Sequence, residues 1–349
     1  MAGVRKRIAI CCCSGRGSAT SRPLLFSTHS DFPQMICPLL PRRIVIGQGA
    51  HAELALLIRS RRADLELRGS KYTDVTADDL LWGDTYLGFK RPPLPTMGNV
   101  RWVHCTGAGV DAWLHPAPLP PEILLTRTSE PFGRSIAEWA LARALAFRQQ
   151  LFALAECQRR HEWAPREVGV LRGSRAVVVG TGDIGSSIAR LFTALGAEVH
   201  GVSRSGGGDR AVFASLSQVA ALPQLVTSAD WLIVTVPLTS ETRGLIGREV
   251  LSACRGAVLI NSGRGEVVDE SLLPEALDAG WLAGAALDVF NVEPLPTASP
   301  LWDDPRVMIS PHMSGLTTIE GAVEGFLECL GEIEQGRLPT RTVDRSREY

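Results

Sequence analysis

The stretch that most constrains the fold is a glycine-rich turn between a valine-rich run and a helical pattern. Residues Ala176–Val179 favour a strand, and Gly180, Gly182 and Gly185 follow in the spacing G-x-G-x-x-G. In that spacing the first glycine makes a tight turn, the second lets backbone N–H groups approach a pyrophosphate, and the third lets the helix pack on the strand. A second strand-forming run follows at 198–202. This order predicts a dinucleotide-binding βαβ unit rather than an ordinary βα turn.

Composition narrows the class of protein. The length of 349 residues suggests two domains, and 45% hydrophobic residues allow a sizeable core. A net charge of −1 gives no reason to expect nucleic acid or a membrane surface as a partner. The eight cysteines lack ligand spacing, which predicts reduced thiols in the cytoplasm and no metal site. No apolar run reaches the roughly 18 residues of a membrane span.

Residues 1–41 differ from the rest of the chain, because they are rich in Arg, Ser, Cys and Pro and contain only one acidic residue, Asp31. The apolar run Ile8–Cys13 follows a basic start but is too short for a signal peptide. We expect a disordered extension, with Met35 as a plausible true start. An organelle transit peptide is the alternative.

From Arg43 onward, strand patterns alternate with helical ones, which predicts a parallel sheet covered on both faces. We expect a helix at 50–60 and strands at 44–46, 63–67, 80–82, 100–105 and 123–126. Two loops, 82–91 and 106–111, follow strand ends and should line a cleft. Four side chains of the first loop could select a second acid group or a bulkier tail, or could form a solvated rim: Trp82, Tyr86, Lys90 and Arg91.

A long helix and a second sheet complete the predicted fold. Ser135–Glu138 is a capping box, and apolar residues continue to Leu154, so we expect one long helix that bridges domains, joins a subunit interface or is simply core. Six further strands are expected at 176–179, 198–202, 231–236, 257–261, 283–289 and 307–309, and a final helix at 317–336. The fold class is α/β, with two doubly wound parallel sheets.

Three residues of catalytic type follow the last three strands. Arg264, Glu293 and His312 each come just past a different strand, so they should converge at the edge where a dinucleotide binds. Arg264 can offer a planar fork of donors to a carboxylate and a neighbouring carbonyl oxygen. His312 can exchange a proton with that oxygen, and Glu293 can stabilise the imidazolium and fix its orientation. The predicted reaction is hydride transfer between a 2-oxo acid and a 2-hydroxy acid.

The end of the strand at 198–202 predicts the cofactor. NAD-preferring sites place Asp or Glu there to bind the ribose hydroxyls, whereas this chain has Ser203, Arg204 and Ser205. A hydroxyl and a guanidinium can both bind a 2′-phosphate, and glycines 206–208 let the loop curl around it. We therefore expect NADP(H), with a site that takes NAD(H) as well as the alternative.

These residues make the sequence similar to the D-isomer-specific 2-hydroxyacid dehydrogenases. Seven ordered motifs within about residues 43–335 carry the resemblance: 106–111, Ala137–Glu138, 179–185, 236–242, 261–265, Asp288 to Leu295 and 311–315. The resemblance implies that Arg264, Glu293 and His312 form the catalytic set, that the backbone at Ala108 and Gly109 binds the substrate carboxylate, and that Asp288 meets the nicotinamide amide. The further cofactor residues that it implies are Thr181, Asp183, Ile184, Val236, Pro237, Thr242, Ser262 and Gly315.

The same resemblance implies a domain division, a partner and a substrate. A flavodoxin-like substrate domain would comprise 42–133 and 319–349, and a Rossmann cofactor domain 134–318. The chain would form a homodimer and reduce a small 2-oxo acid, with glyoxylate or hydroxypyruvate as the first expectation. Formate dehydrogenases of this family carry Gln where this chain has Ser310, which argues against that activity. The alternative is a dinucleotide-sensing scaffold like the C-terminal-binding co-repressors.

Overall fold

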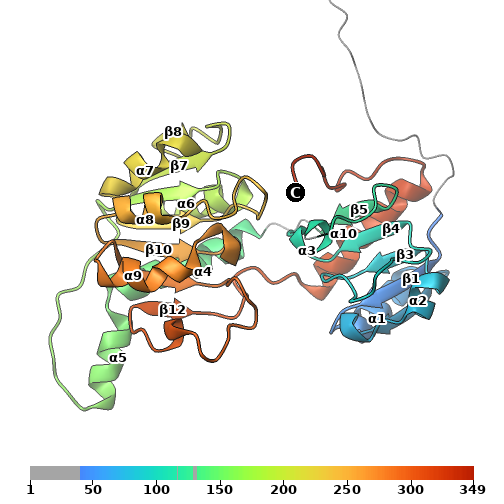
Figure 1. Cartoon of the computed structure of the whole chain (residues 1–349), viewed down its shortest axis with the longest axis horizontal. Helices are drawn as coiled ribbons and strands as arrows, with labels where there is room; N and C mark the ends of the chain where they lie inside the picture. Colours follow the sequence, from blue (N-terminus) through green and yellow to red (C-terminus); the bar gives the residue numbers. More distant parts are fainter. Residues whose placement is uncertain (1–39, 116, 129–131) are drawn as a thin grey trace, which may run out of the picture. The chain divides into compact units, whose positions relative to one another are not determined.

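The protein is represented by a computed structural model that describes residues 40–115, 117–128 and 132–349 (Figure 1). All but the last two residues of the expected N-terminal extension, 1–41, lie outside these ranges, so the extension and its possible transit function stay predictions. None of the helices in the described ranges is long and apolar enough to cross a membrane.

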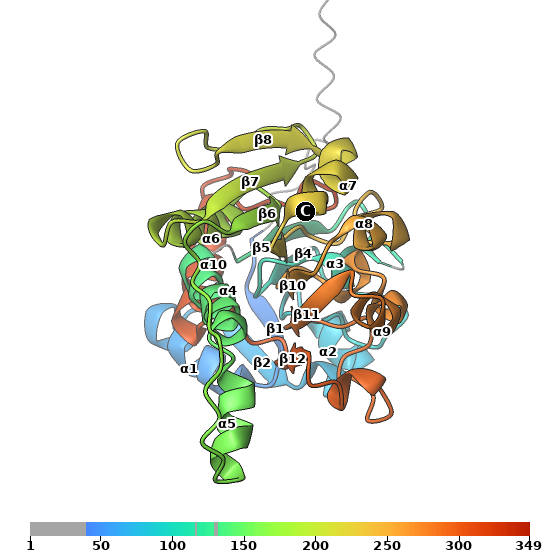
Figure 2. The ribbon, with the colours of Figure 1, turned by 90° about the vertical axis from the view of Figure 1, so that its left-hand side faces the viewer.

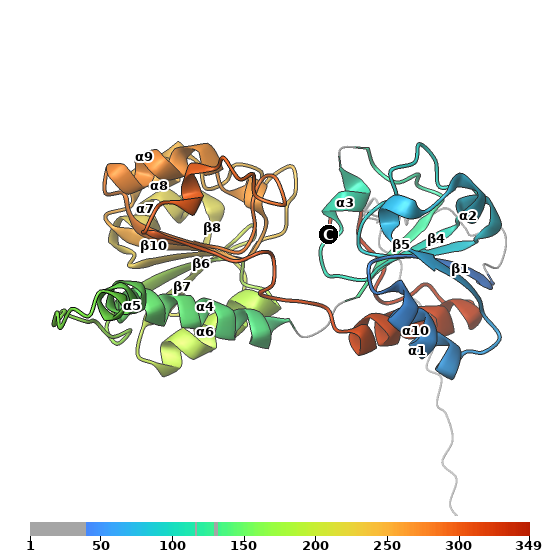
Figure 3. The same cartoon turned by 90° about the horizontal axis from the view of Figure 1, so that it is seen from below.

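The first sheet has five parallel strands in the order β2-β1-β3-β4-β5, which is the flavodoxin-like doubly wound order. Its strands are β1 (Arg43–Gly47), β2 (Glu66–Ser70), β3 (Thr85–Leu87), β4 (Trp102–Cys105) and β5 (Leu124–Arg127). Figure 3 shows α1 (His51–Arg61) and α10 (Ile319–Glu334) on one face, and α2 (Ala77–Trp82) and α3 (Asp111–Leu114) on the other.

The second sheet has seven parallel strands in the order β8-β7-β6-β9-β10-β11-β12. They are β6 (Arg175–Val179), β7 (Glu198–Ser203), β8 (Ser215–Gln218), β9 (Trp231–Val234), β10 (Ala257–Asn261), β11 (Leu282–Leu287) and β12 (Val307–Ile309). One face carries α4 (Gly133–Arg148) and α6 (Asp183–Ala194), and the other carries α7 (Leu222–Leu225), α8 (Arg248–Ala253) and α9 (Leu273–Asp278) (Figure 3). The prediction of two doubly wound α/β sheets is confirmed.

Short 3₁₀ turns complete the described secondary structure: η1 (Tyr72–Asp74), η2 (Val219–Ala221), η3 (Val226–Ser228), η4 (Gly265–Val267), η5 (Glu270–Leu272) and η6 (Pro300–Trp302).

The C-terminal helix α10 packs on the first sheet, although it follows the second sheet in sequence. Its buried stripe, which includes Val323, Phe326 and Leu330, joins one core with Ile44 of β1. Phe326 stacks on Trp102 of β4 with ring centroids 5.0 Å apart, so this large apolar contact attaches the helix to the sheet.

Two strand predictions in the sheets are wrong, and one strand was not predicted. Residues 80–82 end helix α2 instead of forming a strand, and the strand follows at 85–87. The helix starts with a capping box in which Thr76 and Asp79 exchange hydrogen bonds, and this local signal outweighs the short apolar run that suggested a strand. The strand expected at 63–67 lies at 66–70, and the edge strand β8 was missed because Ser215–Gln218 has only one strongly apolar residue.

The single long helix is also wrong. Helix α4 begins at Gly133, and its N-cap residue, Phe132, makes no side-chain cap. The predicted capping box does not form: the Ser135 hydroxyl donates to the Phe132 carbonyl, and Glu138 pairs with Arg134. The helix ends before Gln150, whose φ of +51° is left-handed. Helix α5 (Leu151–Arg159) then starts in a new direction, and Figure 2 shows it extending away from the second sheet.

Candidate active site

The glycine turn after β6 has the geometry that a bound dinucleotide needs. Gly180 has a φ of +108°, and an added Cβ at Gly185 would lie 1.8 Å from the Gly180 carbonyl oxygen, so neither tolerates a side chain. An added Cβ at Gly182 would meet no heavy atom within 4 Å. Thr181 and Gly182 precede helix α6, whose first turn contains Asp183 and Ile184. Open space at the N-terminus of this helix fits a pyrophosphate.

The loop after β7 curls as the glycines predicted. The hydroxyls of Ser203 and Thr181 both donate to the Gly207 carbonyl, over 2.9 Å and 2.6 Å, and the Ser205 hydroxyl accepts from the Gly207 N–H. The Arg204 guanidinium is exposed and lies 3.6 Å from a carboxylate oxygen of Glu241. Ser203 and Arg204 therefore lie at the end of β7, which is where the cofactor prediction places them.

The other predicted cofactor residues lie in loops at the same sheet edge. The Thr242 hydroxyl donates to the Pro237 carbonyl over 2.7 Å and orders the segment after β9, which includes Val236. Ser262 is buried directly after β10. An added Cβ at Gly315 would lie 2.7 Å from Ile136 of α4, so glycine allows the chain to pass that helix closely.

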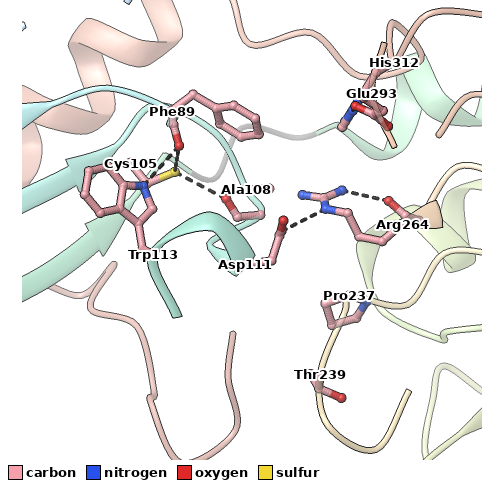
Figure 4. Close-up of polar contacts among 12 residues, drawn as sticks. Phe89, Cys105, Ala108, Asp111, Trp113, Pro237, Thr239, Arg264, Glu293 and His312 are labelled. Atoms are coloured by element: carbon pink, nitrogen blue, oxygen red, sulfur yellow. Dashed lines mark hydrogen bonds and ion pairs between the residues drawn. The ribbon is translucent and has the colours of Figure 1, made fainter. Parts of the chain in front are cut away.

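His312 and Glu293 form a direct pair (Figure 4). The His312 Nδ1 atom lies 2.8 Å from a Glu293 oxygen, and the other Glu293 oxygen accepts from the Phe290 N–H over 3.1 Å. Although burial acts to raise it, the pKa of Glu293 is lowered by the hydrogen bond and charge of His312. An ionised Glu293 thus orients the ring and leaves the Nε2 atom of His312 for a substrate.

Buried Asp288 fixes the backbone that carries His312. One of its oxygens accepts from the Ser310 hydroxyl over 2.5 Å and from the Met313 N–H, and the other accepts from the Ser314 N–H. The His312 N–H donates to the Asp288 carbonyl over 2.7 Å, and His312 has a φ of +51°. The resemblance assigned Asp288 to the nicotinamide amide. In the structure both carboxylate oxygens already bind the 310–314 loop.

Arg264 meets a partner that the sequence did not identify. Its Nε atom donates to Asp111 over 2.9 Å, and its Nη1 atom donates to the Gly263 carbonyl over 2.7 Å (Figure 4). An added Cβ at Gly109 would lie 1.5 Å from Arg264 Nη2, so glycine is needed for the guanidinium to approach. The carbonyl of Ala108 accepts from Arg127 over 2.8 Å, which anchors the same loop. Asp111 ends the predicted loop 106–111, but nothing in its sequence position indicated this pairing.

The three predicted catalytic residues line one cavity of 380 Å³, together with Asp111, Lys90 and Arg91. Two aromatic residues expected at the cleft are absent from its lining. Tyr86 is fully buried in the core of the first sheet. The Trp82 ring packs against Arg68, whose guanidinium carbon lies 4.2 Å from the ring centroid. The prediction that Trp82 and Tyr86 face a substrate is therefore wrong.

Comparison with known proteins decides the family. The sequence pattern of the D-isomer specific 2-hydroxyacid dehydrogenase NAD binding domain matches residues 141–314. The chain is 34% identical over 266 residues to glyoxylate/hydroxypyruvate reductase A of Serratia proteamaculans, a match that covers 73% of this chain and 84% of the relative. The chain belongs to the D-isomer specific 2-hydroxyacid dehydrogenases.

Solved structures of this dehydrogenase family share the whole fold. A D-isomer specific 2-hydroxyacid dehydrogenase from Xanthobacter autotrophicus Py2, in complex with NADPH and MES, is 30% identical, covers 88% of this chain and 100% of its own, and has a TM-score of 0.77. An NADPH-dependent glyoxylate/hydroxypyruvate reductase from Sinorhizobium meliloti, in complex with NADP and sulfate, is 26% identical, covers 88% and 100%, and also has a TM-score of 0.77. The chain is thus an NAD(P)-dependent 2-hydroxyacid dehydrogenase, and the prediction of an enzyme is confirmed.

Proposed function

We propose that this dehydrogenase works as a reductase of small 2-oxo acids such as glyoxylate and hydroxypyruvate, with NADPH as the reductant. The observation that carries the proposal is the position of Arg264, Glu293 and His312 around one cavity, in loops of the same sheet whose strand β6 leads into the open glycine turn. The names of the relatives from Serratia proteamaculans and Sinorhizobium meliloti support the substrate.

The proposed mechanism uses each side chain once. With its pyrophosphate at the glycine turn, NADPH would supply the hydride that reduces the carbonyl carbon of the 2-oxo acid. Arg264 binds the substrate carboxylate and polarises the carbonyl oxygen, assisted by the backbone N–H groups at Ala108 and Gly109. His312 Nε2 donates a proton to that oxygen, and the carboxylate of Glu293, 2.8 Å from Nδ1, stabilises the imidazolium before transfer.

A panel of 2-oxo acids tests this function directly. The full-length protein should oxidise NADPH in the presence of glyoxylate and hydroxypyruvate, and should reduce NADP with the matching 2-hydroxy acids. Absorbance of the reduced nicotinamide gives both rates. Binding of NADPH without turnover of any 2-oxo acid would instead support the dinucleotide-sensing scaffold.

The proposed preference for NADPH rests on the loop after β7. Ser203 and exposed Arg204 stand where an acid would repel a 2′-phosphate. The complexes of the two structural relatives with NADPH and NADP support the same preference. The nearby carboxylate of Glu241 would have to release Arg204 for the phosphate, and its 3.6 Å separation on an exposed surface makes that a weak competitor.

A double substitution should reverse this preference. Ser203→Asp with Arg204→Ala introduces a charge that repels the 2′-phosphate and removes one that attracts it. The ratio of kcat/KM for NADPH to that for NADH should fall by at least about tenfold, the factor for one lost charge-assisted contact. Arg59→Ala, which removes an exposed arginine on α1, is the control and should leave the ratio unchanged. Equal efficiency with both cofactors in the unmodified enzyme would contradict the assignment.

The domain division and the homodimer are part of the same proposal. We assign 42–133 and 319–349 to a substrate domain and 134–318 to a cofactor domain, because α10 shares the core of the first sheet.

Exposed apolar side chains on α5 and the segment after it support a subunit interface: Leu151, Phe152, Trp163 and Val170. The mass of the protein in solution tests the dimer. Four free, buried cysteines in the described ranges support a cytoplasmic location.

A further inference from the structure

We propose that Lys90 forms a subsite for a second carboxylate, and that the preferred substrates include 2-oxo dicarboxylic acids. This inference rests on the proposed function, because Lys90 lines the cavity that also contains Arg264, Glu293 and His312. Glyoxylate has no carbon beyond its carbonyl group and could not reach such a subsite. A four-carbon 2-oxo diacid presents a second carboxylate two carbons beyond the carbonyl.

The charge balance of the cavity lining distinguishes Lys90 from its neighbours. Its other charged side chains are already engaged: Arg264 with Asp111, His312 with Glu293, Glu266 with Arg243, His115 with Glu348, and Arg91 with the Ala117 carbonyl. Lys90 is the exception, since within the described ranges its ammonium has neither a carboxylate partner nor a hydrogen bond. Within the part of the chain that the structure describes, Lys90 and Arg91 of this lining lack an acidic partner, and of the two Lys90 also lacks a hydrogen bond to its charged group.

Lys90 also lies between the catalytic cavity and a neighbouring one. Lys90 lines the cavity that holds the catalytic residues and also an adjoining cavity of 360 Å³, and His312 lines both. Tyr72 and Phe89 are shared in the same way, so Lys90 belongs to the part of the surface that connects the two spaces. A ligand bound at His312 can thus extend toward Lys90.

The backbone of Lys90 is held by a hydrogen bond, whereas its ammonium has only a ring contact within the described ranges. Buried Tyr86 donates its hydroxyl hydrogen to the Lys90 carbonyl over 3.1 Å. The Lys90 Nζ atom lies 5.7 Å from the centroid of the Tyr72 ring, a weak cation–π contact that a carboxylate can replace or supplement. A fixed backbone and an ammonium without a carboxylate partner in the described ranges suit recognition of a carboxylate as a point charge.

The test compares two substrates that differ in one group. Oxaloacetate carries a carboxylate where pyruvate has a hydrogen on its methyl group, and the reacting ends are the same. For the unmodified enzyme, kcat/KM should be higher for oxaloacetate. Lys90→Ala should lower the ratio of oxaloacetate to pyruvate about tenfold, the factor for one charge-assisted bond, whereas Lys90→Arg should retain most of it. Lys71→Ala is the matched control, since Lys71 is exposed nearby but lines neither cavity.

The outcomes separate this inference from the proposed function. If no 2-oxo acid is reduced, the proposed function fails. If glyoxylate and pyruvate are reduced but Lys90→Ala leaves the ratio unchanged, or lowers both rates equally, the subsite is overturned while the reductase stands. A similar loss of the ratio in Lys71→Ala would show a general effect of surface charge, and would also overturn the subsite.

Discussion

Replacing His312 with alanine is expected to lower kcat by at least about 100-fold in both directions, the usual contribution of a positioned acid–base group. The ring is the proton donor of the proposed mechanism and its Nδ1 atom is 2.8 Å from Glu293. The glycine turn does not involve this side chain, so the dissociation constant for NADPH should not change. Steady-state rates and a fluorescence titration of NADPH measure the two quantities. A near-normal kcat in this variant would rule out the mechanism.

Glu293→Gln is the companion variant, because it removes the charge next to His312 but retains a hydrogen-bonding side chain. The pKa of Glu293 is lowered, so the unmodified side chain is a carboxylate near neutral pH and favours the imidazolium over the neutral ring. In the variant no neighbouring carboxylate stabilises the imidazolium. Reduction needs the protonated ring, so its alkaline limb should move to lower pH. Oxidation needs the neutral ring, so its acidic limb should move the same way. Unmoved limbs would contradict the role given to Glu293.

Replacing Arg264 with alanine should lower kcat/KM for every 2-oxo acid by roughly 30-fold or more, the effect of truncating one partner of a hydrogen-bonded charge pair. The side chain is only 20% exposed, so water replaces the guanidinium poorly. Arg264→Lys should recover only part of the loss, because lysine keeps the charge but lacks the planar fork. Initial rates over a range of substrate concentration measure the effect.

Two neighbouring variants refine the Arg264 result. Asp111→Asn keeps an oxygen that can accept from Nε, so it should lose much less activity than Arg264→Ala. Gly109→Ala keeps the arginine but displaces it, since the new Cβ would overlap Nη2, and should lower kcat/KM in the same direction. Full activity in Gly109→Ala would mean that the guanidinium does not work from the observed position.

The sequence was sufficient to group the three residues proposed to be catalytic, because parallel strands bring their carboxyl ends to one edge of a sheet. Arg264 follows β10, Glu293 follows β11 and His312 follows β12. These three strands are neighbours in the second sheet, so the loops after them lie close together. The pairing of Arg264 with Asp111 was not predictable in this way, because Asp111 follows a strand of the other sheet. No periodicity relates residues of two separate sheets.

The local errors have a common cause, which is that short patterns were interpreted without their contacts. Trp82 looked like a ligand-facing aromatic, yet it ends a helix and packs under Arg68. Ser135 and Glu138 had the spacing of a capping box, but the helix had already begun two residues earlier. Lys90 differs from these cases, because it lines the cavity as its loop position predicted and has no carboxylate partner among the described residues.

The site is divided between two sheets, with His312 and Glu293 on the second and Gly109 on the first. The substrate carboxylate does not react, but in the proposed mechanism it joins Arg264 to the Gly109 loop. Its binding energy therefore contributes to bringing the carbonyl carbon into reaction geometry, not only to holding the molecule. An aldehyde without that carboxylate would lose turnover at saturation as well as affinity. Under this mechanism the enzyme would distinguish acids from simple aldehydes by rate as well as by binding.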